Sequence, residues 1–236
     1  MSDQGQGLER CFALLPCAGS GSRAGTAQPK QYQAVAGRPM VQHTLEVFAR
    51  VARIAQVLVV VAPGDRVLHA VGAAYCTAEC GGTTRAESVF NGLNHLLASG
   101  AAPRDWVLVH DAARCLVTPA QVNALIDACL ADAVGGLLAL PLPDTLKRAE
   151  HGRAAETVDR ADKWLAQTPQ MFRLGLLRDA LAAHTASGFV GITDEASAME
   201  AAGHQPLLVR GSAQNLKVTY PEDFALAEAI LKGRNR

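Results

Sequence analysis

Residues 11–24 read CFALLPCAGSGSRA, an apolar run that passes directly into a glycine-rich loop. The run from Cys11 to Pro16 predicts a strand, and Gly19 to Ala24 has the spacing G-x-G-x-x-A. Glycine-rich loops at the carboxyl end of a strand are typical of α/β proteins that bind the phosphates of a nucleotide. This stretch therefore indicates both the fold class and a phosphate ligand.

Short β-rich runs alternate with amphipathic segments along the rest of the chain. The expected strands are 11–16, 57–61, 106–110, 135–140 and segments near Leu207 and Leu216. The expected helices are 39–51, 65–74, 85–97, 119 to about 131 after a Thr118 cap, 174–186, one from Asp194 and one from Pro221. This alternation predicts an α/β fold, a Rossmann-like, mostly parallel sheet with helices on both faces, which binds ligands at the carboxyl ends of its strands.

The alternation stops between Pro143 and Pro169. Segments 145–148 and 155–160 flank His151-Gly152-Arg153 and predict a two-stranded hairpin. An isolated hairpin is marginally stable in water, so we expect it to pack on another surface, with a second subunit as one candidate. We interpret residues 1–236 as a single domain with a projecting arm at about 143–169.

The overall composition excludes several classes of protein. The chain has 236 residues with 22 Lys+Arg and 22 Asp+Glu, and this balance argues against a nucleic-acid-binding protein. Its six cysteines include no Cys-x-x-Cys pair, which favours reduced thiols in the cytoplasm over a zinc site. The polar N-terminus and the lack of a long apolar run predict neither a signal peptide nor a membrane span.

Two cations near the loop point to a triphosphate rather than a dinucleotide. Arg23 and Lys30 flank the predicted phosphate cradle, and the acidic residue expected at the end of a second dinucleotide-binding strand is missing. The loop is not a Walker loop either, because Thr26 rather than lysine follows Gly25. Two cations suit a reaction in which pyrophosphate leaves. The alternative is a glycine-rich turn with basic residues on the surface.

Ten short motifs resemble one known family, in order and over nearly the whole chain. They are AGSGSR at 18–23, PKQY at 29–32, GG at 81–82, Arg85 with Ser88-Val89, HDAAR at 110–114, DTLK at 144–147, TVDR at 157–160, TPQ at 168–170, TDEAS at 193–197 and LKVT at 216–219. The sequence resembles the 2-C-methyl-D-erythritol 4-phosphate cytidylyltransferases of non-mevalonate isoprenoid biosynthesis, whose fold is of the nucleotide-diphospho-sugar transferase type.

The resemblance implies an Mg²⁺-dependent transfer of CMP from CTP to methylerythritol phosphate by an arm-exchanged homodimer. The catalytic residues it implies are Arg23, Lys30, Arg160 and Lys217. The implied nucleotide-binding residues are Ala18, Gly19, Ser20, Gly21, Gly81, Gly82, Ser88, Asp111 and Ala112. The implied contacts to methylerythritol phosphate are Thr145, Arg160, Thr193 and Lys217.

Several of these residues have more than one interpretation. Asp111 follows a strand and has three candidate roles: it binds Mg²⁺ directly or through water, it contacts the ribose, or it fixes Arg114. His110 is interpreted as a hydrogen-bonded core residue rather than a general base, since a phosphate nucleophile is already ionised. Asp194 and Glu195 are expected to open a helix with Thr193 as its N-cap and both acids in its first turn, which is enough to explain them.

The two residues assigned to the second substrate also have plain alternatives. Arg160 would otherwise form an ion pair with Asp159 or Asp162, and Lys217 would be a solvated lysine at a strand end. The rival activities are a cytidylyltransferase for another polyol phosphate, such as ribitol 5-phosphate, a sugar 1-phosphate nucleotidyltransferase, and an inactive nucleotide-binding regulator. Thr83 stands where the family often has an acidic residue, which leaves part of the base contact open.

Overall fold

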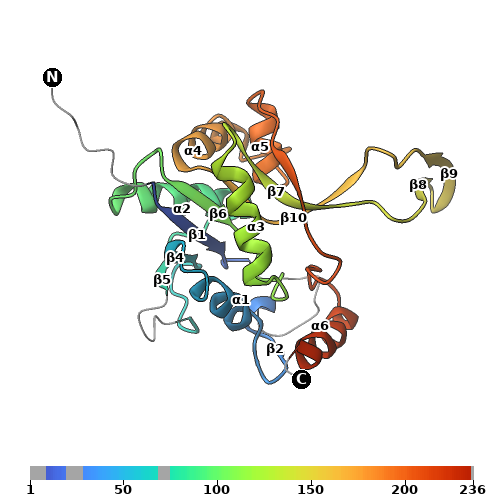
Figure 1. Ribbon diagram of the computed structural model, residues 1–236, viewed down its shortest axis with the longest axis horizontal. Helices are drawn as coiled ribbons and strands as arrows, with labels where there is room; N and C mark the ends of the chain where they lie inside the picture. The colour runs from blue at the N-terminus through green and yellow to red at the C-terminus, as the bar shows by residue number, and fades with distance from the viewer. Residues whose placement is uncertain (1–8, 20–28, 69–74, 235–236) are drawn as a thin grey trace.

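A computed structural model describes residues 9–19, 29–68 and 75–234 (Figure 1). Its central element is a seven-stranded sheet with the order β11-β7-β10-β6-β1-β4-β5. The strands are β1 (Cys11–Pro16), β4 (Ile54–Val60), β5 (Cys76–Ala78), β6 (Trp106–Val109), β7 (Gly135–Pro141), β10 (Trp164–Arg173) and β11 (Leu207–Arg210). Every neighbouring pair is parallel except the two that β10 forms, with β6 and with β7. The predicted mostly parallel sheet is confirmed.

Helices cover both faces of the sheet because successive strand residues point to opposite sides. In β1, Ala13 and Leu15 join one buried cluster, whereas Phe12 and Leu14 join the other. The first cluster includes α1 (Met40–Ala49) and α3 (Pro119–Leu130). The second includes α2 (Arg85–Ala98), α4 (Leu174–Ala182) and α5 (Glu195–Ala201). The last helix, α6 (Pro221–Arg234), packs by the short strand β2 (Ala34–Val35), which pairs with β3 (Arg38–Pro39).

Side-chain caps set the beginnings of three helices. The Thr118 side chain accepts a hydrogen bond from the backbone of Gln121 in a capping box, with Pro119 as the first helical residue of α3. Asp194 caps α5 in the same way through Ser197, and Thr84 caps α2. The helix starts expected at Thr118 and Asp194 are confirmed, but the expected cap at Thr193 is wrong, because the Asp194 side chain accepts the bond from the Ser197 amide.

The antiparallel strand β10 was not predicted. Pro169 lies inside it, and proline normally argues against a central strand. Its register with β7 shifts between Ala166 and Gln170, so the strand has no regular alternation that a sequence pattern would detect. Its first three residues are exposed and its next six are buried, so the strand begins in the arm and continues into the core.

Three other expectations were wrong in part. Residues 65–68 are not helical, because the Asp65 carboxylate accepts hydrogen bonds from the backbone amides of Val67 and Leu68 and holds a turn; residues 69–74 lie outside the described range. The segment near Leu216 is not a strand, although the Val218 amide donates a hydrogen bond to the carbonyl of Ala113, a few residues beyond β6. Helix α4 ends at Ala182, and a short 3-10 turn follows at Thr185–Ser187.

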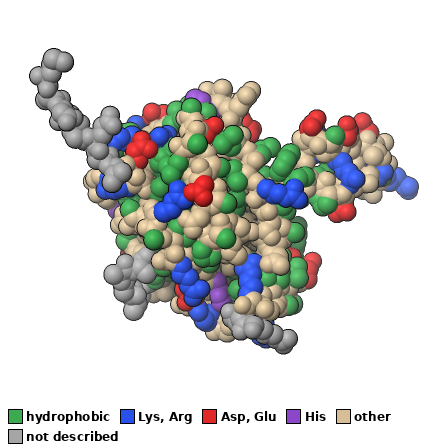
Figure 2. Space-filling model, in the orientation of Figure 1, with side chains coloured by type: hydrophobic (Ala, Val, Ile, Leu, Met, Phe, Trp, Pro, Cys, Tyr) green, Lys and Arg blue, Asp and Glu red, His purple; other side chains and the backbone are tan. Residues whose placement is uncertain are grey.

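The predicted hairpin is confirmed and projects from the body of the molecule (Figure 1). Its strands are β8 (Leu146–Glu150) and β9 (Arg153–Val158). His151 and Gly152 form the two-residue turn with φ values of 49° and 77°, both positive as a type I′ hairpin turn requires. Nearly all residues of the hairpin, from 146 to 158, are exposed, and the hairpin stands out from the body in the space-filling view (Figure 2).

No helix within the described ranges is long and apolar enough to cross a bilayer.

Candidate active site

A cavity of about 470 Å³ opens where β1 and β6 end, beside the beginning of α2. Parallel strands end at the same edge of a sheet, so the segments that follow them meet there. Its wall consists of Pro16, Cys17, Ala18, Gly19, Lys30, Gln31, Gly82, Thr83, Thr84, Arg85, Ser88, Asp111, Ala112, Ala113 and Lys217. Segments from five distant parts of the sequence therefore form one site, at the edge where a ligand was expected.

Gln31 holds the start of the glycine-rich loop. Its buried side-chain amide donates to the carbonyl oxygens of Cys17, at 2.7 Å, and Gly19, at 3.1 Å. The Cys17 amide in turn donates to Val60 at 2.7 Å, so the loop begins as a continuation of the β1–β4 pairing. Ala18 and Gly19 lie on the cavity wall. Ser20, Gly21 and Arg23 lie outside the described residues.

Lys30 and Lys217 meet on the same wall. The Lys30 ammonium donates to the carbonyl of Val218 at 2.7 Å, and the Lys217 ammonium lies 2.7 Å from Asp111 Oδ2. The amide of Val218 donates to Ala113 at 2.8 Å, which fixes this segment beside the end of β6. Two cations that are 187 residues apart in sequence thus lie along one side of the cavity.

The two glycines before α2 differ in what they do. A side chain at Gly81 would place its Cβ 2.2 Å from the Cβ of Ala18, so Gly81 allows close packing of the two loops and does not line the cavity. Gly82 does line it, and its amide donates to the Ser88 hydroxyl at 3.0 Å. The Ser88 hydroxyl donates to the carbonyl of Thr84 at 2.9 Å and so fixes the turn.

A carboxylate lies at Thr83 even though the residue itself is not acidic. Glu87 Oε2 accepts hydrogen bonds from the Thr83 amide at 2.6 Å and the Thr83 hydroxyl at 2.7 Å. These bonds, the hydroxyl first, lower the pKa of Glu87. The negative charge that the family often places after its glycines is supplied here from the first turn of α2.

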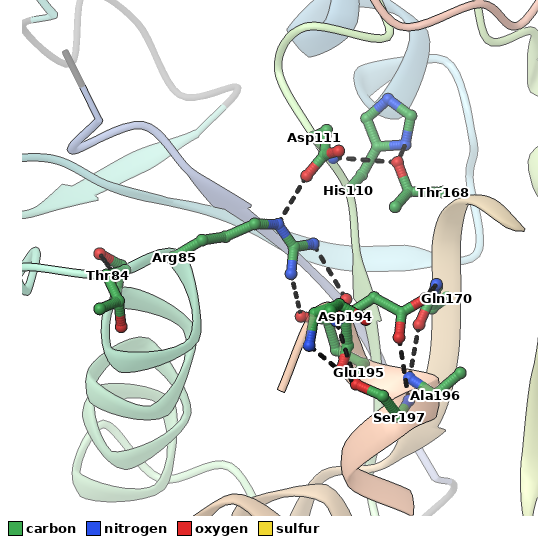
Figure 3. A network of polar contacts seen from close by, with 12 residues as sticks. Thr84, Arg85, His110, Asp111, Thr168, Gln170, Asp194, Glu195, Ala196 and Ser197 are labelled. Carbon is green, nitrogen blue, oxygen red and sulfur yellow. Dashed lines mark hydrogen bonds and ion pairs between the residues drawn. The ribbon is translucent and has the colours of Figure 1, made fainter. Parts of the chain in front are cut away.

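The centre of the site is an ion-pair network that crosses from α2 to α5 (Figure 3). Arg85 Nε lies 2.8 Å from Asp111 Oδ1, and its two terminal nitrogens donate to the carboxylate of Glu195 at 2.7 and 3.0 Å. Glu195 is 1% exposed. A position in the first turn of a helix is therefore not the whole explanation of Glu195, because its buried carboxylate binds Arg85.

This network fixes the charges of its members. Burial would raise the pKa of Asp111, but Arg85 and Lys217 outweigh that effect and hold the pKa well below its usual range. Burial would lower the pKa of Arg85, and the carboxylates of Asp111 and Glu195 reverse it and raise the pKa. Asp111 is therefore a carboxylate at every working pH.

His110 belongs to the core, as expected, and supports Asp111 from behind. The Asp111 amide donates to Thr168 Oγ1 at 3.0 Å, and Thr168 Oγ1 lies 3.1 Å from His110 Nδ1. His110 Nε2 lies 3.2 Å from the carbonyl of Arg114, which only accepts, so Nε2 carries the proton and Nδ1 accepts from Thr168. Burial lowers the pKa of His110 to about 3, so the ring is neutral.

A second cavity, of about 210 Å³, adjoins the first. Arg85, Asp111 and Lys217 line both. Thr193, exposed just before α5, lies on the second wall, and so does Arg114, to which sequence analysis gave no site role. Arg114 donates to the carbonyl of Asn215 at 2.7 Å and to that of Ala166 at 3.1 Å, and the signal that could have found it was its place in the HDAAR motif.

Comparison with known proteins decides the family. The sequence profile of the 2-C-methyl-D-erythritol 4-phosphate cytidylyltransferases matches residues 11–233. The chain belongs to this family. A cytidylyltransferase of Ralstonia nicotianae is 56% identical over 95% of the chain and 92% of the relative. A crystal structure of a 4-diphosphocytidyl-2C-methyl-D-erythritol synthase, 41% identical, covers 94% of this chain and 99% of its own with a TM-score of 0.84.

A bifunctional relative of Albidiferax ferrireducens is 64% identical over 96% of the chain, and the chain spans about half of it, 54%. Family membership establishes the chemistry of this chain as that of a cytidylyltransferase, an enzyme that transfers CMP from CTP to 2-C-methyl-D-erythritol 4-phosphate in isoprenoid biosynthesis. The resemblance given by the ten motifs is thereby confirmed, together with the fold.

Two residues that the family resemblance assigns to the second substrate lie away from both cavities. Thr145 and Arg160 are exposed at the base of the arm and line neither cavity. Arg160 donates to the carbonyl of Pro143. Among the described residues it forms no ion pair with Asp159 or Asp162, so that alternative is wrong in this structure. Lys217, paired with Asp111, is not the solvated lysine of the other alternative.

Among the described residues, the wall of the larger cavity offers a cation one carboxylate, that of Asp111. Within the described ranges no group of three or more His, Cys, Asp and Glu side chains is arranged to hold a metal ion. Both oxygens of Asp111 are already paired, one with Arg85 and one with Lys217, and each still has a second lone pair. Mg²⁺ commonly binds through one or two carboxylates together with substrate phosphates and water, and Asp111 fits that pattern.

Proposed function

We propose that CMP transfer takes place at the wall between the two cavities, with CTP in the larger one and the polyol phosphate in the smaller. The observation that supports this arrangement is that Arg85, Asp111 and Lys217 line both cavities. A reaction between two phosphates needs them side by side and needs their negative charges compensated. The shared wall places them side by side, and its two cations, together with Lys30 of the larger cavity, outnumber the one carboxylate, Asp111, on that cavity's wall.

The chemistry needs positioning and charge compensation rather than a covalent intermediate. A phosphate oxygen of the polyol phosphate attacks the α-phosphorus of CTP in line, a new P–O bond forms, and the bond to the bridging oxygen of pyrophosphate breaks. The attacking phosphate is already ionised, and the neutral, buried His110 is not available as a base. We assign Lys30 and Lys217, together with Arg23 of the loop, to the charge that builds on phosphorus and pyrophosphate.

We propose that the nucleotide lies along the glycine-rich loop and the turn before α2. Ala18, Gly19 and Gly82 line the cavity, and so does Ala112, which follows Asp111. Such small residues let amide groups approach phosphates closely. The turn from Gly82 to Ser88, stiffened by Glu87, is the candidate reader of the cytosine edge.

We propose Mg²⁺ as the metal that accompanies CTP, with Asp111 as its protein ligand, directly or through water. When bound, the ion would neutralise phosphate charge and orient the triphosphate. The low pKa of Asp111 supports this role, since the carboxylate stays ionised.

We propose that the arm completes the site of a second copy in an arm-exchanged homodimer. Thr145 and Arg160 are exposed in the chain described here, although both belong to motifs of the family. At the arm base, Trp164 is 38% and Leu165 49% exposed, which suits a contact surface.

A cytoplasmic location, with no nucleic-acid partner, is supported by six free cysteines and by a formal net charge of zero.

A pyrophosphate-release assay tests the proposed function. CTP and UTP are each offered with methylerythritol 4-phosphate, ribitol 5-phosphate and a sugar 1-phosphate. We expect release with CTP and methylerythritol 4-phosphate, and far less with every other pair. Preference for ribitol 5-phosphate would overturn the substrate, and no release with any pair would overturn the activity.

A further inference from the structure

Glu195 lies outside both cavities and is nevertheless joined to their shared wall. It is the first residue of α5, 1% exposed, and on the wall of neither cavity as the described residues form them. Its carboxylate accepts hydrogen bonds from both terminal nitrogens of Arg85, and the Nε of Arg85 donates to Asp111 (Figure 3). Glu195 therefore contacts the reacting groups only through Arg85.

The position of α5 is itself fixed by the sheet. Gln170 of β10 donates to the Asp194 carboxylate at 2.8 Å and accepts from the Ala196 amide at 2.7 Å. Gln170 is 1% exposed, so this clamp is buried. With its backbone held on the sheet, Glu195 offers Arg85 a fixed point rather than a mobile partner.

Charge balance gives Glu195 a second effect. Arg85 and Lys217 bring two positive charges to the shared wall, and Asp111 and Glu195 bring two negative ones. Without Glu195, Arg85 and Lys217 would share Asp111 as their carboxylate partner. A buried ion pair contributes little net stability compared with apolar packing of the same volume, so stability alone is a weak explanation for this one.

We propose that Glu195 is a positioning residue for CMP transfer: it holds Arg85, and through Arg85 it fixes the Asp111 carboxylate between the two substrates. This inference rests on the proposed function of the shared wall. The effect of Glu195 on kcat can be separated from any effect on substrate affinity. A displaced Asp111 disturbs the alignment of the two bound phosphates more than it weakens the binding of either substrate. Misplacement by about 1 Å can slow a reaction about 100-fold.

The test is Glu195→Gln in the full chain, which keeps the shape and removes the charge. We expect kcat to fall about tenfold or more, whereas the CTP dissociation constant, measured by calorimetry without the polyol phosphate, changes less than about threefold. Glu195→Asp should recover part of kcat. Glu200→Gln is the matched control, since Glu200 is exposed on the same helix and the charge change is the same.

A double-mutant cycle separates positioning from a merely structural role. If Glu195 acts through Asp111, adding Glu195→Gln to Asp111→Asn should slow the enzyme less than about threefold further, because the two changes remove one interaction. The inference would be overturned if the fold loss of kcat in the double variant equalled the product of the losses in the two single variants. A Glu195→Gln enzyme with wild-type kcat would also overturn it. Should Glu195→Gln fail to fold, Arg85→Lys keeps the cation but not the bridge to two carboxylates, and the same kcat loss is expected. A wild-type chain without turnover would instead contradict the proposed function.

Discussion

Lys217 lies on the wall that the two cavities share and pairs with one carboxylate there. Its ammonium is 2.7 Å from Asp111 and lines both cavities. We predict that Lys217→Gln lowers kcat/KM for the polyol phosphate about 100-fold or more, because it removes charge from the transition state. Lys232→Gln on α6 is the control, since that lysine is 66% exposed and pairs only with Glu228. Steady-state kinetics measure both variants, and equal kcat/KM values would remove Lys217 from the mechanism.

His110 predicts a pH dependence of stability. Its pKa is lowered to about 3 by burial, so the folded state binds fewer protons than the unfolded state between that value and about 6.5. Stability is then complete above about pH 6.5 and falls by about 1.4 kcal/mol per pH unit below it. Asp111, whose pKa is also lowered, adds to the loss only at still lower pH.

Urea denaturation between pH 7 and pH 4 measures this slope. His110→Gln keeps one donor and one acceptor for Arg114 and Thr168, and it should flatten the slope even though it lowers stability at pH 7. The same slope in both proteins would mean that another group carries the titration. The pH–rate profile should show no inflection from His110.

Sequence reasoning found single charged residues better than pairs. The resemblance drew attention to Asp111 and Lys217, which the structure brings together. The Arg85–Glu195 pair escaped because its members are 110 residues apart, and no local pattern links the beginnings of two helices that meet only in space. Arg85 was part of a family motif, whereas nothing in the sequence indicated that the Glu195 side chain is buried against it.

At the scale of elements, caps predict well because their signal is local. The beginnings of α3 and α5 were predicted to within a few residues from Thr118-Pro119 and Thr193-Asp194. Strand β10 escaped because its pairing partners lie far away in sequence and Pro169 interrupts its pattern. A carboxylate that forms a turn with its own neighbours, as Asp65 does, competes with the helix that was expected there.

The two caps should separate stability from activity. We predict that Thr118→Ala costs about 1 kcal/mol of the free energy of unfolding and leaves kcat unchanged, because α3 contributes no residue to either cavity. Asp194→Ala should cost a similar free energy and also lower kcat, since α5 carries Glu195. Urea denaturation and kinetics on the same samples measure both. Equal losses of kcat in the two variants would contradict this division.

At the scale of the whole molecule, arm exchange makes a quantitative prediction. Arg160→Ala and Lys217→Gln should each inactivate the homodimer, but a mixed dimer pairs an intact arm with an intact Lys217 at one of its two sites. Random mixing of equal amounts makes half of the dimers mixed, so about a quarter of wild-type activity should return. The mixture must be refolded or coexpressed so that subunits exchange. If each arm served its own chain, the mixture would stay inactive.

Strand β10 ties the arm to the chemistry. Its exposed beginning, Trp164 and Leu165, forms the arm base, and Thr168 of the same strand accepts a hydrogen bond from the amide of Asp111. The arm base and the residue that holds the Asp111 amide are therefore parts of one strand, only a few residues apart. A small molecule bound at the arm base should slow turnover while CTP still binds in the larger cavity, and so be noncompetitive with respect to CTP. Inhibitor design against this enzyme therefore has a second target at the arm base, where CTP does not compete.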